Sequence, residues 1–208
     1  MKYIINLAAA LALLVASFGQ YTTVSAADVR KTSTLGVEAF FSSTDPSGCI
    51  VTEVGLSARD DTRKEPPQPG TTESLVVLSI YQYNICTGEQ LIFGEAFGWL
   101  EEGDLQVSKK LGSATLNTTL IDFEDASGGP IREVYVDLTW SATEPATLSS
   151  GHTHFTTPDC KYMGHWKGMS RFADVTGTVS AGTTNFTPEA GSGSIFSDKS
   201  SAIFIDCE

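Results

Sequence analysis

The sequence predicts an all-β protein, an antiparallel β-sandwich or barrel of about nine strands with meander-like connections. Short segments alternate apolar and polar residues, and Gly, Pro, Asn, Asp and Ser interrupt them at short intervals. No long segment repeats apolar residues at helical spacing. Alternation with period two buries one face of a strand, and short connections favour antiparallel neighbours. Because a sandwich and a barrel share this alternation, both architectures stay open.

The segment IREVYVDLTW (131–140) is the clearest strand, since Val134, Val136, Leu138 and Trp140 share one face. Its other face is polar or amphipathic, which is typical of a strand with one buried side. The remaining strands are expected at 34–42, 48–58, 73–86, 91–100, 114–125, 146–156, 165–182 and 192–207.

The segment LIFGEAFGWL (91–100) has an aromatic face and a face of small residues. Phe93, Phe97 and Trp99 share one face with Glu95, while glycines and Ala96 mostly occupy the other. Large aromatic side chains are usually core residues, so we expect Trp99 to be buried. The aromatic residues left as surface platforms are Trp166, Tyr81 and Tyr83.

Residues 1–26 have the layout of a secretory signal peptide: an early lysine, an apolar run, and small residues before a cleavage site after Ala26. We expect residues 27–208 to form a single all-β domain. No other segment is apolar enough to span a bilayer. The mature protein is therefore predicted to be secreted or extracytoplasmic, with no transmembrane segment.

The four cysteines form an even set, which in an extracytoplasmic chain indicates two disulfides. The charged and then Pro-rich segment 59–73 is expected to be a mobile, exposed hairpin loop. Symmetric pairing about the middle of this loop places Cys49 opposite Cys86. Cys160 and Cys207 then form the second predicted bridge.

The chain is acidic, with 25 Asp and Glu against 13 Lys and Arg and a net charge of −12. This balance disfavours nucleic acid and anionic membranes as partners. The acidic clusters 101–104 and 122–129 lack the D-x-D-x-D-G pattern of a calcium loop, so they are interpreted as solvated turns. The segments 117–119 and 185–187 fit the N-glycosylation acceptor pattern.

The stretch GHTHF holds His152 and His154, two of the three histidines of the chain. Residues two apart on a strand share a face. A hairpin centred between Asp159 and Cys160 would place His165 opposite His154, so that three imidazoles converge. Three histidines with an open fourth position are a common catalytic zinc arrangement. The alternative is that the histidines line the polar face of an ordinary hairpin.

Other catalytic motifs are absent: the sequence has no GxSxG, no HExxH and no phosphate-binding glycine loop. The sequence therefore favours a non-enzymatic binding or surface-interaction module without a cofactor, with a polysaccharide or an envelope component as the candidate partner. One alternative is a metal-dependent enzyme in which His152, His154 and His165 bind zinc or another transition metal. The other is a carbohydrate-binding module, which requires coplanar exposed aromatic side chains.

Overall fold

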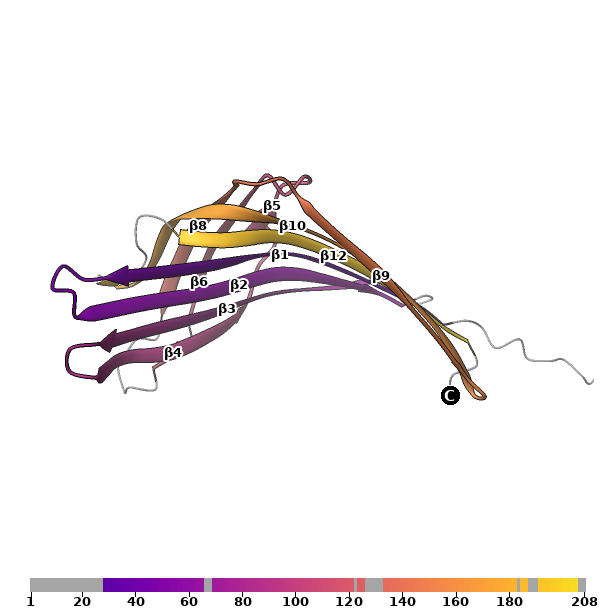
Figure 1. The fold of residues 1–208 in the computed structure, drawn as a ribbon, viewed down its shortest axis with the longest axis horizontal. Helices are drawn as coiled ribbons and strands as arrows, with labels where there is room; N and C mark the ends of the chain where they lie inside the picture. Colours follow the sequence, from indigo (N-terminus) through magenta and orange to yellow (C-terminus); the bar gives the residue numbers. More distant parts are fainter. Residues whose placement is uncertain are drawn as a thin grey trace, which may run out of the picture.

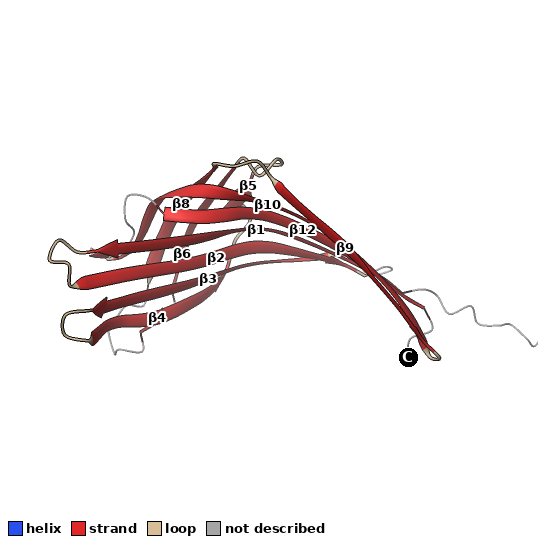
Figure 2. Ribbon diagram, in the orientation of Figure 1, coloured by secondary structure: helices blue, strands red, loops and turns tan. Residues whose placement is uncertain are grey.

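The chain folds into a single antiparallel sheet of twelve strands, as seen in a computed structural model (Figures 1 and 2). The structure describes residues 28–65, 69–121, 123–125, 133–182, 184–186 and 191–205. The strands are β1 (Asp28–Thr44), β2 (Ile50–Lys64), β3 (Thr71–Asn84), β4 (Glu89–Trp99), β5 (Leu105–Val107), β6 (Ser113–Leu120), β7 (Glu124–Asp125), β8 (Val134–Ala142), β9 (Thr147–Thr157), β10 (Cys160–Ala181), β11 (Thr184–Asn185) and β12 (Gly191–Ile205). Within the described ranges, no helix is long and apolar enough to cross a membrane.

The strand order is β5-β6-β8-β10-β12-β1-β2-β3-β4-β7, and β9 and β11 pair with β10. The sheet curls so that its two ends approach each other. A Cβ added to Gly98 of β4 would lie 2.7 Å from Leu120 of β6, which shows how closely the two ends pack. The all-β antiparallel prediction is confirmed. The prediction missed β5 and β11 and joined β7 to β6 as one strand at 114–125; these three strands have only two or three residues each, too few to show alternation.

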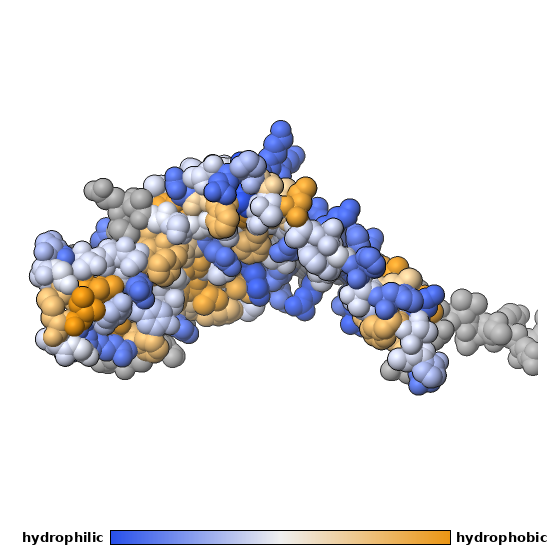
Figure 3. Space-filling view, viewed as in Figure 1, coloured by the Kyte–Doolittle hydropathy of each residue, from blue (hydrophilic) through white to orange (hydrophobic). Residues whose placement is uncertain are grey.

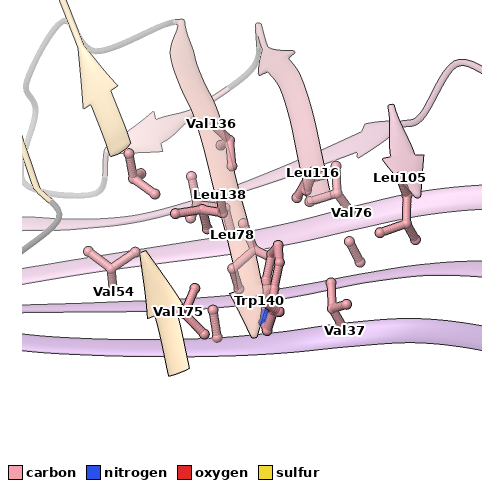
Figure 4. Close-up of a cluster of buried hydrophobic side chains, with 14 of the residues drawn as sticks. Val37, Val54, Val76, Leu78, Leu105, Leu116, Val136, Leu138, Trp140 and Val175 are labelled. Atoms are coloured by element: carbon pink, nitrogen blue, oxygen red, sulfur yellow. The ribbon is translucent and has the colours of Figure 1, made fainter. Parts of the chain in front are cut away.

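The curled part of the sheet, which we call the body, encloses the hydrophobic core (Figure 4). The predicted alternation on β8 is confirmed, because Val134, Val136, Leu138 and Trp140 are fully buried. The indole Nε1 of Trp140 donates a hydrogen bond of 2.7 Å to the backbone oxygen of Glu38, which satisfies the one polar atom of that side chain.

The expectation that Trp99 is buried is wrong. On β4, Phe97 and Trp99 point outward and are 51% and 65% exposed, while Ala96 is buried. The face of small residues forms the inner side because β4 closes the curled sheet against β6. There, Gly98 leaves room for Leu120, and an aromatic side chain would not fit.

The predicted loop at 59–73 is much shorter than expected. Strand β2 continues to Lys64, and β3 already begins at Thr71, opposite Arg63. The predicted Cys49–Cys86 disulfide is confirmed, with the Cα atoms 5.3 Å apart. The register from which it was predicted is wrong by one residue, because Ile50 lies opposite Asn84, and the bridge joins the two turns beyond the paired strands. Cys160 is also disulfide-bonded, and Cys207, its predicted partner, lies outside the described residues.

Strands β1, β2, β3, β9, β10 and β12 extend beyond the body into a narrower projection, which we call the arm (Figure 1). The arm is a single layer of sheet, and on β9 only Gly151 is even partly buried. Gly168 is the only buried residue of β10 before Ala173. The arm comprises residues 28–35, 59–64, 71–74, 147–157, 160–170 and 197–205.

The two faces of the arm follow from the alternation along each strand. On β1, Val37 and Ala39 point into the core. Residues two apart share a face, so Leu35, Ser33 and Lys31 continue the core-facing side outward. We call this side the inner face of the arm and the opposite side its outer face.

Candidate binding surface

The three histidines lie together on the inner face of the arm. His165 of β10 is directly opposite His152 of β9, and His154 is opposite Met163. The predicted pairing of His165 with His154 is therefore wrong by two residues, because the β9–β10 turn is centred one residue earlier than expected. A shift of two residues preserves the face, so all three imidazoles still share one side.

The histidines do not form a compact metal cluster. Among the described residues, no group of three or more His, Cys, Asp or Glu side chains is placed to hold a metal ion. All three imidazoles are exposed on the open face of a single-layer sheet. The metal site remains a prediction.

Lysines accompany the histidines on the inner face. The structure describes seven lysines, and five of them occupy inner-face positions. All five are exposed. The five are Lys31, Lys64, Lys161, Lys167 and Lys199.

Like charges lie directly opposite one another in this surface. Lys31 of β1 is opposite Lys64 of β2, and Lys167 of β10 is opposite Lys199 of β12. Lys199 is opposite Ser33, which places Lys31 diagonally beside Lys199. Opposed residues have Cβ atoms about 4.5–5.5 Å apart, and diagonal neighbours about 7–8 Å. The four lysines therefore form a zigzag row across four adjacent strands, which we call the lysine row.

Nothing in the described part of the chain neutralises this row. The two ion pairs found there, Arg30–Asp28 and Arg59–Asp61, involve outer-face arginines and none of the four lysines. The inner-face positions of the arm strands beyond Asp60 hold no carboxylate. Asp60 itself lies at the end next to the body, opposite Leu35.

The lysine row borders a shallow hollow of about 340 Å³. The imidazole of His165 also lines it, together with hydroxyl groups. Ammonium groups attract anions, and hydroxyls donate or accept hydrogen bonds. The inner-face hydroxyl residues that line it are Ser33, Thr62 and Ser201, whereas the outer-face hydroxyls of Thr32 and Ser200 bond each other at 2.7 Å. The site therefore combines concentrated positive charge with neutral hydrogen-bonding groups.

The β5–β6 loop adds two further lysines beside the arm. Arg171 of β10 donates a 3.4 Å hydrogen bond from its guanidinium to the backbone oxygen of Lys110. Arg171 occupies an inner-face position where the arm joins the body, because it lies opposite the buried Ile195. All seven described lysines thus lie on the inner face or in this adjacent loop.

The outer face of the arm carries aromatic rings instead. Phe155 stacks on Tyr162 with ring centroids 4.9 Å apart, and Tyr162 meets Phe204 edge-on at 5.2 Å. The guanidinium of Arg30 lies 5.0 Å above the ring of Phe204. Trp166 is 45% exposed and covers Gly151 directly across the strands, in agreement with its predicted surface position.

The outer face of the body has a second hollow with aromatic walls. Phe40 and Phe172 border it, and small residues such as Gly55 and Ser57 form its floor. Glu38 also lines the hollow. Away from it, the predicted platform residues Tyr81 and Tyr83 are half-buried and bonded to glutamates across the sheet.

Comparisons with known proteins give no identification: no protein-family model, curated protein or solved structure matches the chain.

Sequence reasoning found the histidines but missed the lysine row. Lys64 fell within the predicted loop, and Lys31 preceded the first predicted strand. The pairs β1–β12 and β10–β12 join distant segments, and no local pattern specifies their register. Counting the charges separately on the two faces of each strand is the one procedure that would have drawn attention to these positions.

Proposed function

We propose that the protein is a secreted, non-catalytic binding module and that the arm is its binding element. The observation that carries this proposal is the construction of the arm. Six strands extend into a single layer that buries almost no core, so its two exposed faces contribute little to folding stability. The disulfide Cys49–Cys86 is compatible with an extracytoplasmic location, where disulfides persist.

A shortened arm tests the proposal. Gly151 and Trp166 are directly opposed, so replacing residues 152–165 by Asn-Gly joins them through a two-residue hairpin turn. Cys207→Ser accompanies the change so that loss of Cys160 leaves no free thiol. The core residues are untouched, so the near-UV signal of the buried Trp140 should persist.

The purified protein and the shortened variant are compared on immobilised polysaccharides, both neutral (dextran, cellulose, chitin) and anionic (dextran sulfate, polygalacturonate). The proposal predicts that the wild-type protein retains at least one polymer and that the variant, which loses the three histidines and Lys161 but keeps the lysine row, binds it more weakly. Absence of binding to every polymer would contradict it. So would release of new reducing ends, because that would indicate an enzyme.

The aromatic hollow on the body supports a second candidate, a module that binds neutral carbohydrate. Aromatic rings stack on sugars, and Phe172 is 65% exposed at the edge of this hollow. In that case, Phe172→Ala would abolish retention on a neutral polymer, whereas the shortened-arm variant would still be retained. The opposite pattern would assign binding to the arm.

A further inference from the structure

The lysine row conflicts with the stability of the sheet. Like charges directly opposite each other on adjacent strands are destabilising, and the row contains two such pairs. His152 and His165 are also directly opposed beside this row. A local rule broken repeatedly at one surface is typical of a functional site rather than a structural one.

We propose that the inner face of the arm binds an anionic polysaccharide, a chain of sugars that carries sulfate or carboxylate groups. This inference rests on the proposed function and names its ligand class. Four ammonium groups in a row would meet successive anionic groups of an extended polymer, and serine and threonine hydroxyls beside them would meet sugar hydroxyls.

The charge distribution makes such a ligand compatible with an acidic protein. At an ionic strength of 0.1 M, charges separated by more than about 10 Å are largely screened. A polymer on the lysine row therefore experiences mainly the charges of the arm, where the lysines face the polymer and the carboxylates of Asp61 and Asp198 lie on the opposite face of the sheet. The net charge of −12 acts on more distant parts of the polymer.

Two features favour a polysaccharide over other anionic partners. Single-stranded nucleic acid requires aromatic platforms for its bases, and the aromatic side chains of the arm lie on the outer face. A flat bilayer is disfavoured by the shape of the sheet. The inner face continues the interior of the body, so the wall formed by β5, β6 and β8 stands on the same side (Figure 4).

Figure 3 shows the side of the sheet opposite the lysine row, because β1, β2 and β3 lie in front of the core in this view. On that side, hydrophilic side chains cover the part of the arm next to the body, and hydrophobic ones appear further out (Figure 3). The inner-face apolar residues at the outer end are Val29, Met163, Ile203 and Ile205. The cationic part of the surface is thus bounded by the body on one side and by apolar residues on the other.

The sequence offers a matched pair of variants. Lys31→Gln/Lys64→Gln removes two charges from the inner face. Arg30→Gln/Arg63→Gln removes the same charge from adjacent positions of the same strands, on the outer face. Binding of dextran sulfate and polygalacturonate is measured by isothermal titration between 50 and 200 mM salt, with neutral dextran as the reference polymer.

The proposal predicts that wild-type protein binds both anionic polymers and does not bind neutral dextran. The lysine variant should bind at least about tenfold more weakly at 50 mM salt. Its plot of log K against log salt concentration should also be less steep by about 1.4, because each charge contributes about 0.7 to the slope on a single-stranded polyanion. The arginine variant should retain wild-type affinity within about twofold.

Each contrary result has a distinct meaning. Equal weakening in both variants would overturn the proposal in favour of overall charge. Tighter binding to duplex DNA or to phosphatidylglycerol vesicles would overturn it in favour of those partners. Salt-reversible self-association in light scattering, lost in the lysine variant, would assign the face to a second copy of this chain. Binding of neutral polymers alone would overturn this inference and leave the proposed function standing, whereas binding of no polymer would overturn both.

Discussion

The same strands run through the body and the arm, yet their inner face is buried in the body and exposed to solvent in the arm. On β1, the positions of Val37, Ala39 and Phe41 are buried, whereas Lys31 lies on the same face and is exposed. The strand geometry is the same in both places. A second wall of the curled sheet covers the body positions, and none of the described residues forms a second layer over the arm (Figure 1). Alternation therefore defines a face, and only a covering layer makes that face a core.

The largest difference in stability between the two regions is expected when a tryptophan of each is replaced by alanine. Trp140→Ala should lower the free energy of unfolding by roughly 5 kcal/mol, because it empties a fully buried site. Trp166→Ala in the arm should cost about 1 kcal/mol or less, since that side chain is half exposed. Urea denaturation of both variants measures the difference. Similar losses would mean that the arm is as cooperative a part of the fold as the body.

The disulfide should have the next largest effect. Cys49→Ser/Cys86→Ser removes a crosslink between positions 37 residues apart, which the chain-entropy treatment values at about 4 kcal/mol. The bridge joins the β1–β2 and β3–β4 turns at the end of the body away from the arm. Calorimetry should show a lower midpoint, while affinity at the arm stays unchanged. A loss of affinity would show that the two regions are coupled.

A smaller, pH-dependent effect is expected in the β1–β2 turn of the body. The backbone N–H of Ile50, and next the hydroxyl of Ser47, donate hydrogen bonds to Asp45 and lower the pKa of its carboxyl group. A lowered pKa contributes stability above the unfolded-state value and loses it as pH falls through the folded-state value.

Asp45→Ala should therefore lower the thermal midpoint at pH 6, and the difference from wild type should narrow below about pH 4, where aspartate protonates. Thermal scans at pH 6 and pH 3 test this expectation. The same difference in thermal midpoint at both pH values would show that the ionised carboxylate of Asp45 does not contribute to stability.

The smallest expected effect has the opposite sign and lies in the arm. Lys31→Gln relieves a directly opposed like-charge pair, so it should raise the free energy of unfolding by about 0.5 kcal/mol. Raising the salt concentration should reduce this gain through screening. Urea titrations at 20 and 500 mM salt measure both. A destabilised variant would mean that the lysine makes a contact that supports the fold.

The candidate surface shows where sequence reasoning ended. The shared face of His152 and His154 followed from their spacing alone, and the face of His165 survived an error of two residues in register. The lysine row required the pairing of β12 with both β1 and β10, which brings Lys31, Lys167 and Lys199 together from distant parts of the chain. No local period records such pairing.

The sequence by itself determined the all-β class, the buried face of β8 and the Cys49–Cys86 bridge, because alternation and a single hairpin are local properties of the chain. Only the tertiary structure decided that Trp99 faces outward and that β2 and β3 continue into an arm. These outcomes depend on which strand faces are covered. The curled sheet closes over its small residues at Gly98, whereas the arm, over which the described residues form no second layer, leaves its lysines in solvent.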